Sequence, residues 1–191
     1  VAARMAQGIR TSANEIYVVD FISEAKNLIT AYSKQLDKNI ELEKGLLSSF
    51  LQGREIKRYK ISSSGKSVVI PYELVESRAT FMSSIIMKEK YPKAFAYLMA
   101  NKSFLENREN GKMRGATWYG YVYPKNIDLM KQKKILIPDI ADRAQFALDE
   151  NGEYAFTSGY GITLKDDTTL SYKYVLGLLN SKVLNFYLKR I

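Results

Sequence analysis

Cysteine and histidine are both absent from the 191 residues of this chain. Without cysteine the chain has no disulfides, no thiolate nucleophiles and no cysteine-based zinc sites. Without histidine it lacks the side chain that most often serves as a general base and as a nitrogen ligand for metals. A cytoplasmic location is expected, because nothing in this composition depends on an oxidising compartment.

Long apolar runs are missing as well. No window approaches the roughly 18 consecutive apolar residues of a membrane-spanning helix. No charged segment followed by an apolar run opens the chain, so we expect neither a secretory signal nor a membrane partner. The chain begins at Val1 rather than methionine, and residues 188–191 continue a helical pattern. We interpret both ends as cuts in a longer protein or as trimmed disorder.

Motifs of known catalytic sites are also lacking. Ser64-Gly65-Lys66 lacks the preceding glycine spacing of a phosphate loop, and the glycine-rich residues 158–161 precede a strand pattern rather than a helix. Asp139 is not followed by the Glu-X-Lys of a metal-dependent nuclease, so Asp139, Asp142 and Asp149 are interpreted as turn residues. The sequence therefore predicts that this chain alone is not an enzyme and binds no metal and no cofactor.

Positive charge, by contrast, is plentiful. The chain carries 29 Lys and Arg residues against 20 Asp and Glu residues, which gives a net charge of +9. Such an excess favours a polyanionic partner through a term that does not depend on sequence. Charge alone leaves open whether that partner is a nucleic acid or an acidic protein.

The densest basic cluster lies within residues 54–66, where Glu55 is the single acidic residue. Its five positive residues are Arg54, Lys57, Arg58, Lys60 and Lys66. Such a group can span several phosphates or reach the edges of bases. The alternative interpretation is a solvated, charged hairpin.

A second cluster covers residues 88–114, with seven positive and three acidic residues. Arg108, Lys112 and Arg114 surround the glycine-containing residues 110–115, and Trp118 and Tyr119 follow. A basic loop beside aromatic residues can enter a DNA groove, so we expect Arg108, Lys112, Arg114 and Tyr119 to contact DNA. The alternative for Trp118 is an ordinary place in the core.

Two further groups have plainer interpretations. Lysines at positions 125, 131, 133 and 134 precede an apolar strand and are interpreted as a solvated turn that protects a sheet edge. Fourteen tyrosines suggest base stacking, but most lie at periodic apolar positions and are expected in the core. These include Tyr17, Tyr97, Tyr174 and Tyr187.

The pattern of apolar residues predicts one α+β unit with a mixed or antiparallel sheet, a central helix and a C-terminal helix. Strands are expected at residues 15–21, 134–138, 145–148, 154–157 and 161–164, with a hairpin turn at 149–152. Residues 56–61 and 67–72 are expected to pair as two strands. Residues 40–51 favour a helix that ends at Gly53, and residues 28–34 fit either a strand or a helix.

The central helix is expected over residues 92–107 because Pro92 suits a first helical turn. The C-terminal helix is expected over residues 170–190, with capping residues at 166–169. Its three- and four-residue spacing predicts a single buried face. That face consists of Val175, Leu178, Leu179, Val183 and Phe186.

Several short motifs occur in an order that resembles a known family. The segment 51–59 is similar to a Gly-Arg-Asp-Ile-X-Arg-Tyr motif, with Glu55 in place of the aspartate, and the segment 176–182 is similar to a closing Leu-Asn-Ser helix. Between them come residues 69–72, 91–108, 118–119, 134–138 and 146–149, and residues 8–19 precede them all. Together they resemble the C-terminal target-recognition domain of TaqI-like and Eco57I-like adenine-N6 DNA methyltransferases, including single-chain type IIG restriction-modification enzymes.

The resemblance implies that residues 1–191 form a domain that recognises double-stranded DNA. A catalytic domain of the same protein, N-terminal to Val1, would use S-adenosylmethionine to methylate adenine, and magnesium if it also cuts DNA. The expected DNA contacts are Arg54, Lys57, Arg58, Lys60, Arg108, Lys112, Arg114 and Tyr119. The alternatives are a basic protein-interaction domain and an independent enzyme, and the missing catalytic motifs count against the enzyme.

Overall fold

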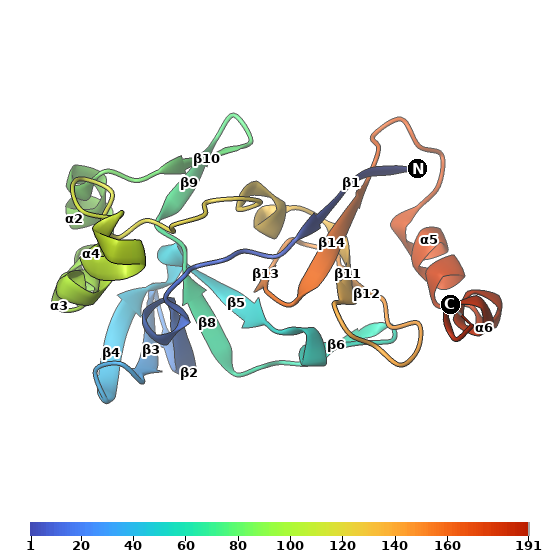
Figure 1. Cartoon of the computed structure of the whole chain (residues 1–191), viewed down its shortest axis with the longest axis horizontal. Helices are drawn as coiled ribbons and strands as arrows, with labels where there is room; N and C mark the ends of the chain where they lie inside the picture. Colours follow the sequence, from blue (N-terminus) through green and yellow to red (C-terminus); the bar gives the residue numbers. More distant parts are fainter. Residues whose placement is uncertain (191) are drawn as a thin grey trace. The chain divides into compact units, whose positions relative to one another are not determined.

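The chain forms two compact units, where the sequence predicted one. The computed structural model describes residues 1–190. Unit 1 comprises Val1–Ile9, Leu51–Ser64 and Leu129–Ile191, and unit 2 comprises Arg10–Phe50 and Gly65–Asp128. The chain therefore enters unit 1 three times and unit 2 twice (Figure 1).

Unit 1 contains a four-stranded sheet. Its strands follow the order β1 (Ala2–Gln7), β14 (Gly159–Leu164), β11 (Lys134–Pro138) and β12 (Ala147–Asp149), and each neighbouring pair is antiparallel. A Cβ atom at Gly159 would lie 2.6 Å from the carbonyl oxygen of Ile137. Glycine is therefore required at this position, where β14 pairs with β11. The unit also contains β13 (Tyr154–Phe156).

Two helices, α5 (Tyr172–Leu179) and α6 (Lys182–Leu188), replace the single helix predicted over residues 170–190. Ser171, rather than residues 166–169, caps α5, since its hydroxyl accepts the N–H of Tyr174. Ser181 adopts an extended conformation, and its hydroxyl accepts the N–H of Leu184 to begin α6. A serine cap that starts a new helix explains the interruption of the apolar pattern.

The interruption also changes which residues are buried. Leu176, which the predicted face did not include, packs with Ile135, Ala144 and Phe146. Val175 and Leu179, which it did include, are half-buried and border this cluster. The rest of the predicted face is wrong, because the helical spacing does not continue across the break. The residues that are exposed instead are Leu178, Val183 and Phe186, together with Tyr174 and Tyr187.

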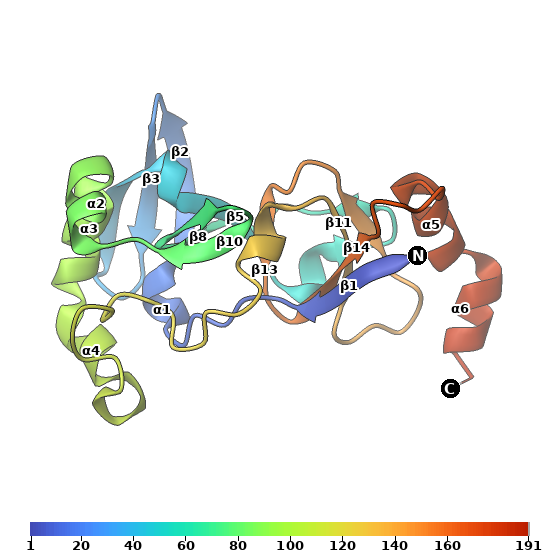
Figure 2. The ribbon, with the colours of Figure 1, turned by 90° about the horizontal axis from the view of Figure 1, so that it is seen from above.

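Unit 2 contains five neighbouring antiparallel strands. Their order is β5 (Leu47–Leu51), β8 (Lys66–Val69), β2 (Val18–Ala25), β3 (Leu28–Ser33) and β4 (Lys38–Glu43). Strand β3, at residues left open between strand and helix, alternates half-buried and buried positions, as expected when one face of a sheet is packed. A separate ribbon pairs β9 (Tyr72–Val75) with β10 (Arg78–Phe81); both strands are labelled in Figure 1, and β10 is labelled again from above in Figure 2.

The helix predicted over residues 40–51 is wrong. The segment forms β4, the short 3-10 turn η1 (Lys44–Leu46) and β5. Its apolar residues fit helical spacing, yet β4 pairs with β3 and β5 pairs with β8. Pairing with distant strands has overridden the local pattern.

Two other strand predictions need correction. The segment 15–21 begins as α1 (Asn14–Tyr17), and β2 starts only at Val18. Residues 56–61 do not pair with 67–72; instead β6 (Ile56–Lys57) pairs with β7 (Lys60–Ile61), and β8 lies between β2 and β5. Residues 62–65 therefore connect β7 to β8, two strands that pair with other partners and not with each other.

Besides α1, unit 2 contains the helices α2 (Ser84–Lys90), α3 (Pro92–Ala100) and α4 (Lys102–Gly111), and α3 packs against β4 (Figure 1). Helix α2 was not predicted from the sequence. The helix expected over residues 92–107 breaks at Asn101, whose side chain donates to the carbonyl of Tyr97. The Glu43 carboxylate accepts the N–H groups of Lys93 and Ala94, a favourable position for negative charge at a helix start.

The α+β class is confirmed. Strand β11 has its predicted bounds, and β12, β13 and β14 lie within two residues of theirs. A turn does follow Asp149, with a positive φ of 67° at Gly152. It is not the predicted hairpin, because β12 pairs with β11.

The packing of α5 predicts unequal effects of two alanine substitutions. Leu176→Ala removes a side chain that is only 9% exposed, so we expect a loss of about 2–5 kcal/mol in unfolding free energy. Val183→Ala, at a 74% exposed position, serves as control and should cost less than about 0.5 kcal/mol. Urea unfolding measures both, and equal losses would refute the burial described here.

Candidate nucleic-acid interface

The first basic cluster begins at η2 (Gly53–Glu55) in unit 1. Glu55 is buried, and one of its carboxylate oxygens accepts the N–H of Gln52 at 2.7 Å, which caps this short turn. The other oxygen accepts a hydrogen bond of 2.7 Å from Nε of Arg54. Glu55 therefore holds the Nε end of the Arg54 guanidinium in place, although the Arg54 side chain is 69% exposed.

The cluster continues into the tight turn between β6 and β7. Lys57, Arg58 and Lys60 are exposed, as the sequence predicted, and Tyr59 has a positive φ of 63°. The guanidinium of Arg58 lies 5.2 Å from the Tyr59 ring centre and donates to the main-chain oxygen of Asn180 at 2.7 Å. These contacts hold the turn in one conformation with its cations at the surface.

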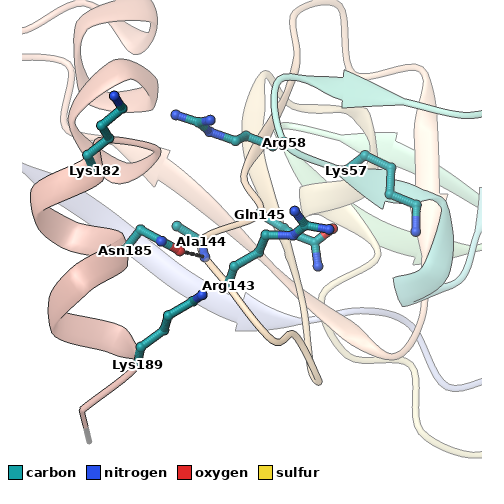
Figure 3. A pocket seen from close by; sticks show the side chains of 8 residues that line it. All are labelled: Lys57, Arg58, Arg143, Ala144, Gln145, Lys182, Asn185 and Lys189. Atoms are coloured by element: carbon teal, nitrogen blue, oxygen red, sulfur yellow. Dashed lines mark hydrogen bonds between the residues drawn. The ribbon is translucent and has the colours of Figure 1, made fainter.

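A groove of about 430 Å³ opens beside this turn (Figure 3). Five of its lining residues are cationic, and none is acidic. The lining consists of Lys57, Arg58, Arg143, Ala144, Gln145, Lys182, Asn185 and Lys189. We call this feature the basic groove.

Three cations of the basic groove, Arg143, Lys182 and Lys189, were not predicted from the sequence. They lie far along the chain from Lys57, so no local cluster reveals them. One signal was available: Lys182, Asn185 and Lys189 follow one another at spacings of three and four residues. That spacing puts all three on one face of a helix.

Asparagine side chains fix the inner wall of the basic groove. Oδ1 of Asn180 accepts the N–H of Phe146 at 3.1 Å, and Nδ2 donates to the Phe146 carbonyl at 2.9 Å. Oδ1 of Asn185 accepts the N–H of Ala144 at 3.0 Å. Asn180 is fully buried. Asn180 and Asn185 therefore hold residues 144–146 against α5 and α6.

The second basic cluster lies in unit 2, and the expected surface position of Arg108 is wrong. The side chain is 7% exposed, and its guanidinium lies 5.6 Å from the ring centre of Tyr17. The guanidinium donates to four carbonyl oxygens at 2.8–3.2 Å, those of Thr11, Leu105, Trp118 and Gly120. Arg108 satisfies main-chain acceptors where helical geometry ends, which explains its burial.

Tyr119 is likewise in the core rather than at a DNA-facing surface. It is fully buried, donates to the Met82 carbonyl at 2.6 Å and lies 4.7 Å from the Phe81 ring. Burial raises the pKa of Tyr119 to about 12, and burial also raises the pKa values of Tyr17 and Tyr121. The alternative interpretation of Trp118 as a core residue is confirmed.

Lys112 and Arg114 are exposed at the turn that follows α4. Positive φ angles at residues 109–111 end the helical geometry within the last residues of α4 and make the chain turn tightly there. Nζ of Lys112 lies 3.6 Å from a Glu109 carboxylate oxygen, and Arg114 donates to Oδ1 of Asn107 at 2.9 Å. This pair and the cluster at Arg54–Lys60 are therefore surface features of different units.

Lys134 is not the solvated edge lysine that was expected. Its side chain is fully buried, and Nζ lies 2.5 Å from Oδ2 of Asp149. It also donates to the carbonyls of Met130 and Gln132. Burial lowers the pKa of Lys134, and Asp149 opposes that shift. Asp149 is thus an ion-pair partner as well as a turn residue.

Within residues 1–190, no group of three or more His, Cys, Asp or Glu side chains has an arrangement that could hold a metal ion. Among the same residues, no helix combines the length and apolar character needed to cross a membrane.

Together, the fold and the charged surfaces define a basic α+β protein with an acid-free groove on one unit. The chain belongs to the family of TaqI-like C-terminal specificity domains, whose family model matches residues 48–191. This membership confirms the resemblance seen in the order of the sequence motifs.

Three curated relatives are similar over most of the chain. The type II restriction enzyme and methyltransferase RM.Eco57I of Escherichia coli is 24% identical over 97% of this chain. The type II methyltransferases M.BanIII of Aneurinibacillus aneurinilyticus and M.BstVI of Geobacillus stearothermophilus are 23% and 22% identical over 94% and 81% of it. The matches cover only 20%, 29% and 24% of those relatives.

The position of Arg108 predicts a structural role that a substitution can test. Arg108→Lys keeps the charge but cannot reach four carbonyls with one ammonium group. Each buried acceptor left without a donor costs about 1–3 kcal/mol, so we expect a loss above about 2 kcal/mol in unfolding free energy. Arg114→Lys, at an exposed position, is the matched control. If chemical denaturation shows that the two variants are equally stable, the buried structural role assigned to Arg108 is wrong.

The raised pKa of Tyr119 predicts loss of stability in alkali. An unfolded tyrosine ionises near pH 10, whereas Tyr119 in the folded chain ionises near pH 12. Stability is therefore complete below about pH 10 and falls as the pH rises through about 12. In Tyr119→Phe that decline should be shallower, although the lost hydrogen bond lowers stability at neutral pH. Urea unfolding across this range checks both slopes, and parallel curves for the two proteins would contradict the assignment.

Proposed function

We propose that residues 1–191 form a DNA target-recognition domain that binds double-stranded DNA and positions an adenine for N6 methylation. The match to a specificity-domain family over residues 48–191, about three quarters of the chain, is the observation that carries this proposal. Its curated relatives are type II methyltransferases, one of them also a restriction enzyme. The methyl transfer itself belongs to a catalytic domain that precedes this one in the same protein.

The exposed cations support a role in DNA binding. Arg54, Lys57, Arg58 and Lys60 extend into solvent from unit 1, where they can meet phosphates and base edges. Lys112 and Arg114 offer a second basic surface on unit 2. Arg108 and Tyr119 have no part in the proposal, because both are buried.

The glycine-rich residues 158–161 do not fit a loop that binds S-adenosylmethionine. Gly159 and Gly161 lie within strand β14, where a Cβ at Gly159 would meet the backbone of Ile137. The glycines therefore serve strand packing rather than a loop that cradles a cofactor at a helix start. We assign S-adenosylmethionine, and magnesium if the protein also cuts DNA, to the catalytic domain, and propose that this chain by itself is not a catalyst.

The alternative is a basic domain that binds acidic proteins. Both partners would be released by salt, so salt dependence does not separate them. Competition does separate them. From a sequence-specific DNA-binding domain, unlabelled cognate duplex displaces a labelled cognate duplex at a far lower concentration than random duplex does. Equal competition by the two duplexes would favour the alternative.

Side-chain chemistry predicts two kinds of DNA-binding variant in the complete protein that carries this chain. Arg54→Ala or Arg58→Ala should remove a contact to a base. We expect a loss of about 1–3 kcal/mol in DNA-binding free energy and a weaker base preference at one position of the recognised sequence. Lys57→Ala or Lys112→Ala should weaken binding to all sequences and reduce the salt slope by about one.

Sequencing of methylated sites in cells reports the preference, and binding at several salt concentrations reports the slope. Lys165→Ala, an exposed lysine outside these clusters, is the control. If all four variants keep the methylated sequence, rate and salt slope of the control, these cations are ordinary solvated surface and DNA binds elsewhere.

A further inference from the structure

We propose that the basic groove of unit 1 binds the phosphodiester backbone of one DNA strand through Lys182 and Lys189, while Gln145 contacts a neighbouring base. The proposal rests on the proposed function and deepens it. It assigns a strand-binding subsite to three residues that lie outside the basic clusters evident in the sequence.

The charge of the basic groove favours an anionic occupant. Five cations line one hollow of about 430 Å³, and its lining contains no carboxylate. Asp142 lies 3.5 Å from Nε of Arg143, but both side chains are largely exposed, so solvent screens the pair. Like charges gathered around a hollow raise the local potential and attract an anion.

The spacing on α6 suits a strand rather than a single anion. Lys182, Asn185 and Lys189 extend from the helix on the side of the groove (Figure 3). Seven residues at about 1.5 Å each separate the two lysines by about 10.5 Å along the helix. The charges of one strand recur about every 3.4 Å along the duplex axis, so two lysines this far apart can meet different phosphates of one strand.

Gln145 is the side chain left to meet a base. Its neighbours are fixed, because Asn185 holds the N–H of Ala144 and Asn180 holds both main-chain groups of Phe146. Gln145 is half-buried, and within residues 1–190 its side-chain amide has no described hydrogen bond. A glutamine amide can donate and accept at once, which matches the major-groove edge of adenine.

The test uses the complete protein and a labelled duplex that contains its methylated sequence, with a random duplex for comparison. Lys182→Ala/Lys189→Ala should lower the slope of log affinity against log salt by about two, with equal losses on both duplexes. Gln145→Ala should leave the slope unchanged and lower the ratio of cognate to random affinity by about 5- to 150-fold. Fluorescence anisotropy measures both quantities.

The matched control is Lys165→Ala/Lys173→Ala, which removes two exposed lysines of unit 1 that do not line the groove. If Lys182→Ala/Lys189→Ala has the same salt slope as this control, the proposed phosphate contacts are wrong. The proposed function still stands in that case, provided that the wild type prefers the duplex with its own sequence. An unchanged affinity ratio in Gln145→Ala overturns the base contact. A wild type that binds both duplexes equally would instead refute the proposed function.

Circular dichroism confirms that each variant is folded before binding is compared. Should the alanine pair prove unstable, Lys182→Gln/Lys189→Gln removes the same charges with longer side chains and must give the same change in slope. A glutamine pair with the slope of the wild type overturns the proposal as well.

Discussion

The Phe146 peptide groups and the Asn180 side chain are the constraint on which the basic groove depends. The carbonyl of Phe146 accepts from Nδ2 of Asn180 and from the N–H of Tyr59, while its own N–H donates to Asn180. The main-chain oxygen of Asn180 in turn accepts from Arg58. Three distant segments therefore meet at one pair of residues. Because these groups are buried or partly buried, leaving any of them without a partner costs about 1–3 kcal/mol.

The sequence predicted elements well where local pattern and tertiary pairing agree, as in β11 at Lys134–Pro138. It failed at residues 40–51, because apolar spacing suited to a helix also serves two strands that pair with distant partners. It also joined helices that Asn101 and Ser181 separate. Hydrogen bonds of single side chains decide such breaks, and hydrophobic periodicity does not register them.

Charge patterning located the exposed cations from Arg54 to Lys60 but misplaced Arg108 and Lys134. A sequence shows that a residue is charged, not which carbonyls lack donors once the chain has folded. Arg108 satisfies four such carbonyls, and Lys134 satisfies two besides its bond to Asp149. The cations of α6 escaped notice for a related reason, because residues more than a hundred positions apart become neighbours only through the fold.

The path of the chain has a consequence for how new specificities arise. Unit 1 is assembled from three separate stretches and unit 2 from two, and β8 from the later stretch of unit 2 lies between β5 and β2 from the earlier one. A crossover between related genes within this region would pair strands from different parents inside one sheet. An exchange of the whole region keeps these strand pairings intact, and point substitutions on exposed positions keep them as well.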